Sequence, residues 1–378
     1  MHLHIRYILL PATRSIILLP VWGCLLILTL IMTQQATAQN PSRKHLGDKH
    51  QDYYDSLTKM NYDRVFPLLG TKVYKRGFDI PWPIGIMFNT FYANQGINIS
   101  DIRVGIQGAD TTLGPVDLSQ VVQFGDVKAK GLTLNMRADL YVLPFLNVYA
   151  MLSYLPKAST DVTLVKPVQL STNATQQGWA YGFGIMGAGG VGPVWIQADY
   201  NVNWADMQLL DNKVFTQIVG IRVGHVFPLQ GSPEKNISLW VGMMGLFINN
   251  DTKGQIKLAD VFPDISQDKI NEIKNSYDQW YNGLRPVQQK VVDKIVEKLQ
   301  DKIDGHPIDD VSINYEMNKA VKSRWAGLVG AQYQFNKRWQ LRTECNLISQ
   351  DRFSLMLSIN YRFLGFKKNI NHTNRSPD

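Results

Sequence analysis

Residues 352–363 alternate strictly between two kinds of side chain, and this feature limits the possible folds more than any other. One set is apolar and comprises Phe353, Leu355, Leu357, Ile359, Tyr361 and Phe363. The other set is mainly polar and comprises Ser354, Met356, Ser358, Asn360 and Arg362. Because successive side chains of a strand point to opposite faces, the segment is predicted to be a strand with one apolar and one polar face.

The same alternation recurs along most of the chain. The ten predicted strands are residues 84–93, 131–142, 145–155, 178–189, 193–204, 215–227, 237–248, 323–335, 338–348 and 352–363. Strands of globular proteins usually have about 5–6 residues, whereas about 9–11 residues are needed to cross a bilayer at a tilt. A closed barrel also satisfies every backbone amide in lipid. We therefore predict an all-β fold, a closed antiparallel transmembrane β-barrel of about ten strands.

The connections between these strands fall into two classes. Turns at one end are mostly short, at 143–144, 190–192, 228–236 and 336–337. Connections at the other end are mostly long, at 94–130, 156–177, 205–214, 249–322 and 349–351. Short periplasmic turns and long outer loops are typical of outer-membrane barrels. Segments 97–107 and 116–124 could add two further strands, so twelve is the alternative count.

The aromatic residues give independent support, since the chain has 9 Trp, 16 Tyr and 15 Phe. On the apolar faces they gather at the two strand ends, where amphipathic rings favour the headgroup layers of a membrane. The outer girdle is predicted to include Trp179, Trp204 and Trp325. The inner girdle is predicted to include Trp339, Tyr361 and Phe363.

Residues 80–366 resemble bacterial outer-membrane β-barrel proteins. The final strand is similar to the barrel-assembly signal of that group, because it ends in Phe363 with apolar residues at two-residue steps before it. About fifteen residues follow Phe363, where many relatives stop. The resemblance implies outer-membrane lipid or lipopolysaccharide as surroundings and the barrel-assembly machinery as a partner during insertion. Signal cleavage before Gln39 is similar to Bacteroidetes-type exported proteins.

Residues 1–38 are interpreted as a cleaved signal peptide. Arg6 and Arg14 precede an apolar stretch at 16–32, and Ala36-Thr37-Ala38 forms a small-x-small site. An uncleaved membrane anchor is the alternative. Residues 39–83 are predicted to be a periplasmic segment, 84–366 the barrel and 367–378 a disordered tail. After cleavage Cys345 is the remaining cysteine, so an intramolecular disulfide is excluded.

The 249–322 loop is too long to serve only as a connection. Apolar residues at helical spacing predict helices over 268–303, interrupted at Gly283 and Pro286. Three arrangements are open: a helical pair capping the barrel rim, a plug in the lumen, or a platform for a partner or for lipopolysaccharide.

Seven charged residues are predicted to face the lumen: Arg137, Asp139, Asp199, Arg222, Arg342, Glu344 and Arg362. Buried charges must be paired with opposite charges or hydrated. They can form a structural ion-pair network or a constriction that sorts small anions by charge. A wide general porin is not favoured, because the interior of an eight-stranded barrel is already filled by side chains and wide channels need about sixteen strands.

Other chemistry has little support in the sequence. The formal charge of +8 is spread along the chain, which argues against nucleic-acid binding. Metal, cofactor and catalytic motifs are absent; His225 falls on an apolar face, and Asp309 and Asp310 near His306 form only a weak protease-like pair. We expect a narrow or gated passive channel, porin-like in class, or a structural surface protein. The alternatives are a receptor or adhesin acting through 249–322 and a membrane-embedded lipid-modifying enzyme.

Overall fold

The computed structural model describes residues 48–107, 112–119, 122–166, 170–191, 193–230, 232–249, 251–257, 267–290, 292–293, 297, 312–349 and 351–368. Its helices are α2 (Asp48–Lys59), α3 (Gly70–Lys75) and α5 (Gln267–Asn282). Its strands are β1 (Ile84–Gln107), β2 (Thr112–Asp117), β3 (Gln123–Leu143), β4 (Leu146–Lys166), β5 (Leu170–Val191), β6 (Val194–Met207), β7 (Val214–Pro228), β8 (Asn236–Ile248), β9 (Asp251–Lys257), β10 (Ser312–Val321), β11 (Trp325–Gln334), β12 (Trp339–Ile348) and β13 (Arg352–Phe363).

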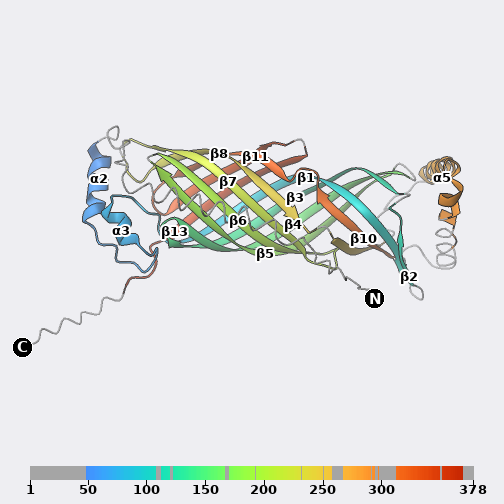
Figure 1. Ribbon diagram of the computed structural model, residues 1–378, viewed down its shortest axis with the longest axis horizontal. Helices are drawn as coiled ribbons and strands as arrows, with labels where there is room; N and C mark the ends of the chain where they lie inside the picture. The colour runs from blue at the N-terminus through green and yellow to red at the C-terminus, as the bar shows by residue number, and fades with distance from the viewer. Residues whose placement is uncertain are drawn as a thin grey trace, which may run out of the picture.

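Within the described residues, ten strands close an antiparallel ring in the order β1, β3, β4, β5, β6, β7, β8, β11, β12 and β13 (Figure 1). The first and last strands pair, with Ile84 opposite Phe363 and Gln95 opposite Arg352, so the ring has no free edge. All ten predicted strands are present. The twelve-strand alternative is wrong, because residues 97–107 continue β1 and residues 116–124 supply only the end of β2 and the start of β3.

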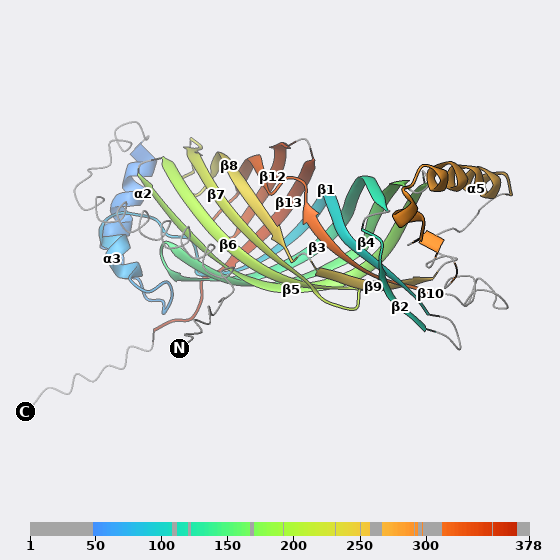
Figure 2. The same ribbon diagram turned by 45° about the vertical axis from the view of Figure 1, so that its right-hand side comes forward.

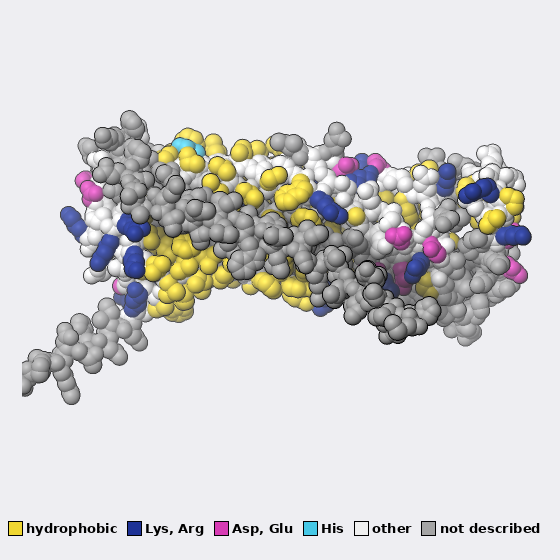
Figure 3. Space-filling model, in the orientation of Figure 1, with side chains coloured by type: hydrophobic (Ala, Val, Ile, Leu, Met, Phe, Trp, Pro, Cys, Tyr) yellow, Lys and Arg dark blue, Asp and Glu magenta, His cyan; other side chains and the backbone are white. Residues whose placement is uncertain are grey.

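The outer wall of the ring is apolar and faces away from the protein interior. Val241 is 63% exposed, Phe88 60% and Phe183 59%, and on the face shown in Figure 3 hydrophobic side chains gather over the barrel between more polar ends. A soluble protein rarely exposes such a continuous surface. A closed ring with an apolar exterior is a membrane-spanning barrel. Among the described residues, no helix has both the length and the apolar character needed to cross a membrane.

Clusters of aromatic residues lie at both ends of the apolar wall. At the outer end the rings of Trp204 and Phe215 are 5.3 Å apart, and those of Phe247 and Trp325 are 6.0 Å apart. Trp179 lies 4.7 Å from Tyr154 at the same end. At the inner end Tyr361 lies between Trp339 and Phe363, with both ring distances at 4.7 Å. The wall therefore ends in aromatic clusters on both sides, as a bilayer requires.

A second, curved set of strands continues outward from the barrel, and we call it the collar. It consists of the outer parts of β1, β3, β4 and β5 together with β9 and β10 (Figure 2). Strand β10 takes over the edge of β1 where β13 ends, with Val321 opposite Ile97. The amide of Asp211 donates to the carbonyl of Lys253, which joins the β6–β7 connection to β9.

The sequence missed β9 and β10 in the 249–322 loop. Their faces do not sort cleanly into apolar and polar residues, and β10 forms because the outer half of β1 offers an unpaired edge. The predicted helix is confirmed for α5, followed by a break at Gly283 and a helical stretch from Pro286 to Lys290. Helix α5 lies beyond the collar rather than in the lumen (Figure 1). Most of residues 291–303 lie outside the described residues.

Residues 48–83 fold beneath the inner end of the barrel, and we call this segment the cap (Figure 1). Leu57 is 1% exposed and anchors α2. The amide of Leu68 donates to the carbonyl of Val142 at 2.8 Å. Lys367 pairs with Arg64 of the cap, so the start of the predicted tail is ordered because the cap supplies backbone partners. The predicted signal peptide lies outside the described residues.

Candidate functional site: the charged lumen

Side chains on the polar faces of the strands converge inside the ring. The first cluster centres on Asp139 of β3, whose Oδ1 accepts from Arg362 Nη2 at 2.6 Å and from Asn147 Nδ2 at 2.7 Å. Arg137 donates to Asn147 Oδ1 at 3.0 Å, and its guanidinium lies 3.6 Å from the ring centroid of Tyr149. Residues from three strands thus form one connected group at the inner end of the lumen.

The second cluster centres on Glu344 of β12. Arg222 donates to both carboxylate oxygens, each at 2.8 Å, in a bidentate pair. Arg342 and the indole of Trp240 donate to Oε2 at 2.9 and 3.0 Å. Arg222 also bonds to Asp199 on the neighbouring strand. Glu344 therefore accepts from three different side chains in the middle of the ring.

A glycine makes room for this second cluster. A Cβ added at Gly220 would lie 2.5 Å from Arg222 Nη1 and 2.8 Å from Asp199 Oδ1. Real Cβ atoms essentially never lie this close to another atom, so a larger residue at position 220 would displace the side chain of Arg222 or Asp199. The Arg222–Asp199 pair thus depends on the absence of a side chain on β7 at this position.

The structure places all seven charged residues predicted for the lumen inside the ring and brings them into these two clusters. Each of the four arginines has an acidic partner within 4.0 Å. Their side chains are largely buried, so the pairing offsets the cost of removing the charges from water. At this level the lumen is narrow, because Arg222 of β7 reaches Glu344 of β12, which lies three strands away around the ring.

Several buried polar atoms on the lumen side have no hydrogen-bond partner among the described residues. They are Asn89 Oδ1, Gln95 Oε1, Arg137 Nε, Asp139 Oδ2, Arg342 Nε, Ser358 Oγ and Asn360 Oδ1. Buried polar groups of native proteins are almost always satisfied, commonly by internal water. These atoms therefore favour a hydrated lumen beside the ion pairs.

Arg352 is a lumen-facing charge that the sequence analysis missed. It lies one two-residue step before Ser354 on the polar face of β13, so extending the alternation by one position would have found it. Its side chain is buried. Nη1 donates to the carbonyls of Arg324 and Met244, at 3.3 and 3.5 Å.

Above Arg352 the lumen becomes apolar. The buried residues Ile97, Val127 and Val321 form a cluster, which we call the apolar septum together with the residues packed on it. Those residues are Ile99, Phe124, Ala129, Val162, Leu246 and Ile248. Val162 belongs to β4 and Leu246 to β8, which do not pair with each other. The side chains of the septum therefore cross the lumen from one wall to the other.

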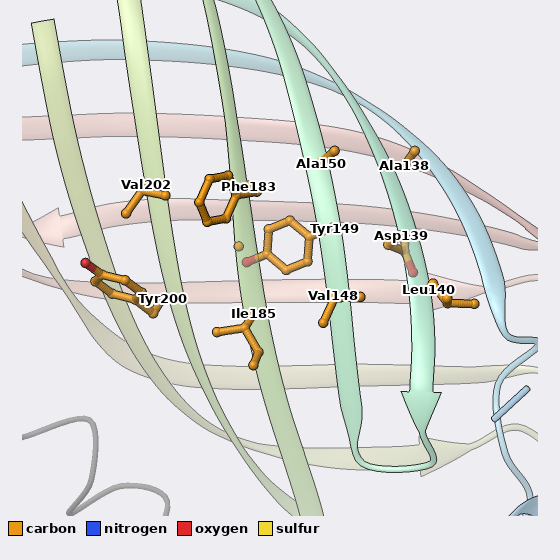
Figure 4. Close-up of a pocket in the computed structure, with 11 residues that line it drawn as sticks. Ala138, Asp139, Leu140, Val148, Tyr149, Ala150, Phe183, Ile185, Tyr200 and Val202 are labelled. Atoms are coloured by element: carbon orange, nitrogen blue, oxygen red, sulfur yellow. The ribbon is translucent and has the colours of Figure 1, made fainter. Parts of the chain in front are cut away.

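A hollow on the outside of the barrel is a separate feature. Phe183, Ile185 and Val202 line it, and they lie on the lipid-facing wall over β5 and β6 (Figure 4). Asp139 and Tyr149 approach it only from the lumen side. Because its lining is apolar, acyl chains can fill it, and we do not assign it to the site.

The outside of the collar carries exposed ion pairs. Lys130 Nζ donates to Asp161 Oδ2 at 2.7 Å, and this hydrogen bond holds the pKa of Asp161 below its ordinary value. Lys253 bonds to Glu316 at 2.8 Å, which raises the pKa of the lysine. Such pairs contribute little to stability in water, so they suit a surface outside the membrane.

No group of three potential metal ligands gathers anywhere in the part of the chain that the structure describes. His225 lies on the lipid-facing wall against Phe227, with 4.3 Å between ring centroids. The predicted weak acid pair at 309–310 and His306 lie outside the described residues.

The ring and its interior define a ten-stranded membrane barrel with a charged, narrow lumen. No protein-family model matches the sequence, and no curated protein matches it. Similar solved structures include the β-domain of the Bordetella autotransporter BrkA, with 10% identity over 74% of this chain and 100% of that chain (TM-score 0.35). The outer membrane protein OprG of Pseudomonas aeruginosa has 10% identity over 75% and 99% (TM-score 0.32). The Ralstonia pickettii toluene transporter TbuX has 10% identity over 74% and 90% (TM-score 0.27). Likenesses this low transfer no function to this chain.

Proposed function

We propose that this protein resides in the bacterial outer membrane and forms a narrow, gated passage for small solutes. The observation that carries the proposal is the row of buried lumen atoms that need water partners beside the ion pairs. A fully packed structural core would satisfy such atoms with protein groups. A hydrated interior lined by arginine and carboxylate groups can conduct small ions.

The size of the ring limits what can pass. Ten strands enclose little free space, and Arg222, Glu344 and Arg342 lie across the middle of it. The apolar septum narrows the outer half further. The proposed solutes are therefore small, and a general porin function is excluded on size.

The cap is proposed to gate the inner mouth. Asp79 accepts from Lys337 of the β11–β12 turn at 3.0 Å and from the Tyr53 hydroxyl at 2.7 Å. Burial, with the charge of Asp79, raises the pKa of Tyr53, so the hydroxyl stays protonated and remains a donor. Arg362 of the lumen donates to the carbonyl of Trp82 at 2.6 Å. A few polar contacts thus couple the cap to both the rim and the lumen.

A charge exchange between the cap and the rim tests the passage. Asp79→Lys or Lys337→Asp replaces an attraction by a repulsion, and we expect each to raise the open probability several-fold in single-channel recordings of refolded mature protein. The double variant D79K/K337D restores the pair and should return the open probability toward that of the wild type.

Lys72→Glu, on an exposed part of α3, is the matched control and should leave the recordings unchanged. Complete absence of conductance in the wild type, both single variants and a variant lacking only the helical residues 267–290, which leaves β9 and β10 in place, would refute the passage. The barrel would then be a structural surface protein. The receptor and lipid-modifying alternatives, and lipopolysaccharide as a partner, stay predictions.

A further inference from the structure

We infer that Arg352 binds the carboxylate of a small organic anion whose short apolar tail lies against the septum. This inference deepens the proposed passage by naming the class of solute. It rests on three features of the lumen: a buried guanidinium without an acidic partner among the described residues, the apolar side chains of the septum on its outer side, and the polar side chains of the two charged clusters on its inner side.

Arg352 differs from the other arginines of the lumen. Arg137, Arg222, Arg342 and Arg362 each lie within 4.0 Å of a carboxylate, whereas Arg352 has no acidic partner within the described residues. It is only 6% exposed. Both of its hydrogen bonds use Nη1 and reach backbone carbonyls at 3.3 and 3.5 Å. Its remaining donors, on Nε and Nη2, have no protein acceptor in the described part of the chain.

A buried, unpaired guanidinium is costly, and an anion can offset that cost. Arginine presents its donors in a planar fork that matches a carboxylate with two parallel hydrogen bonds. Gln95, directly opposite Arg352 in the β1–β13 pair, is also buried and has an unsatisfied Oε1. The site therefore has hydrogen-bonding groups that make no hydrogen bond to the described part of the protein.

The surroundings decide which anions fit. Ile97 follows Gln95 by one two-residue step on the same face of β1, and Leu246 follows Met244 in the same way on β8. Both belong to the apolar septum. A strongly hydrated inorganic anion would lose its water next to these side chains without compensation. A carboxylate with a tail of a few carbons would bury the tail against them and gain from it.

Binding can be measured without any conductance, by isothermal titration of the refolded full-length mature protein in detergent. We expect hexanoate to bind more tightly than acetate, and both hexanol and chloride to bind at least ten-fold more weakly than hexanoate. Arg352→Gln should weaken hexanoate binding at least ten-fold. Arg103→Gln removes the same charge from a collar position where the side chain is 57% exposed, and it should leave binding unchanged.

Two further variants separate the site from a folding defect. Arg352→Lys keeps the charge and should bind hexanoate with intermediate affinity. Val321→Asn should weaken hexanoate and leave acetate unaffected, because only the tail contacts the septum. Each variant is compared only after heat-modifiable mobility on a gel shows a folded barrel.

Equal affinity of the wild type and R352Q for hexanoate, or equal affinity for hexanoate and hexanol, would overturn the inference. If hexanoate binds as described and no variant conducts, the site stands and the proposed passage fails. If the protein conducts and R352Q changes neither hexanoate binding nor the chloride-to-hexanoate reversal potential, the passage stands and the inference fails.

Discussion

Replacing Glu344 by Gln is expected to lower the free energy of unfolding by about 3–5 kcal/mol, the range typical of breaking a buried ion pair from one side. The carboxylate accepts from Arg222, Arg342 and Trp240 in the middle of the lumen. Without its charge, Arg222 retains Asp199 as an acidic partner, whereas Arg342 loses the carboxylate that lies 2.9 Å from its Nη2. Urea unfolding of refolded protein in lipid vesicles, followed by tryptophan fluorescence, measures the loss.

Glu316→Gln is the matched control for this change. Glu316 also pairs with a cation, Lys253 at 2.8 Å, but on the outside of the collar, where both side chains remain partly exposed. Its loss should cost at most about 1 kcal/mol. Equal effects of the two substitutions would show that the lumen pairs are solvated like surface pairs, and that the interior is far wider than described.

Leu357→Arg is expected to destabilise the inserted barrel by about 2–4 kcal/mol, the cost of a cation at the middle of the lipid-facing surface. Leu357 is 52% exposed on the outer wall of β13, halfway between Phe353 and Tyr361 near the two ends. In a soluble protein, a charge at so exposed a position would be almost neutral. Unfolding from vesicles, and the yield of heat-modifiable protein, measure the effect.

Val165→Arg provides the comparison for Leu357→Arg. Val165 is similarly exposed, at 44%, but lies on the collar near the outer end of β4. We expect Val165→Arg to change the free energy of unfolding by no more than about 0.5 kcal/mol. If V165R is as harmful as L357R, or if L357R is harmless, the assumed boundary between membrane and water is wrong.

The barrel could be predicted from the sequence because the pattern that identifies each strand lies within that strand. Each of the ten strands carries its own period-two pattern, and the apolar face of β13 alone fixes which of its residues meet lipid. The same alternation assigned Glu344 and Arg222 to the lumen, although they are far apart in the chain. Closure of the ring then brings Glu344 and Arg222 together in the structure.

The collar and the cap could not be predicted in this way. Strand β10 forms because the outer half of β1 has an edge that β13 does not cover. No local pattern in residues 312–321 indicates that they pair with β1. The cap depends on isolated long-range contacts such as Lys337 with Asp79. Arg352 was missed for a simpler reason, since it is the first residue of its strand.

The central proposal is that the ring crosses the outer membrane with the cap on the periplasmic side and the collar outside, and cysteine accessibility tests it most directly. In a Cys345→Ser background, Asn282→Cys places a thiol at the end of α5, and Lys72→Cys places one on α3 of the cap. An impermeant maleimide is applied to intact Gram-negative cells that produce each variant. We predict labelling at 282 in intact cells and at 72 only after the outer membrane is permeabilised. Labelling at 72 in intact cells, or at 282 only after permeabilisation, would contradict the account.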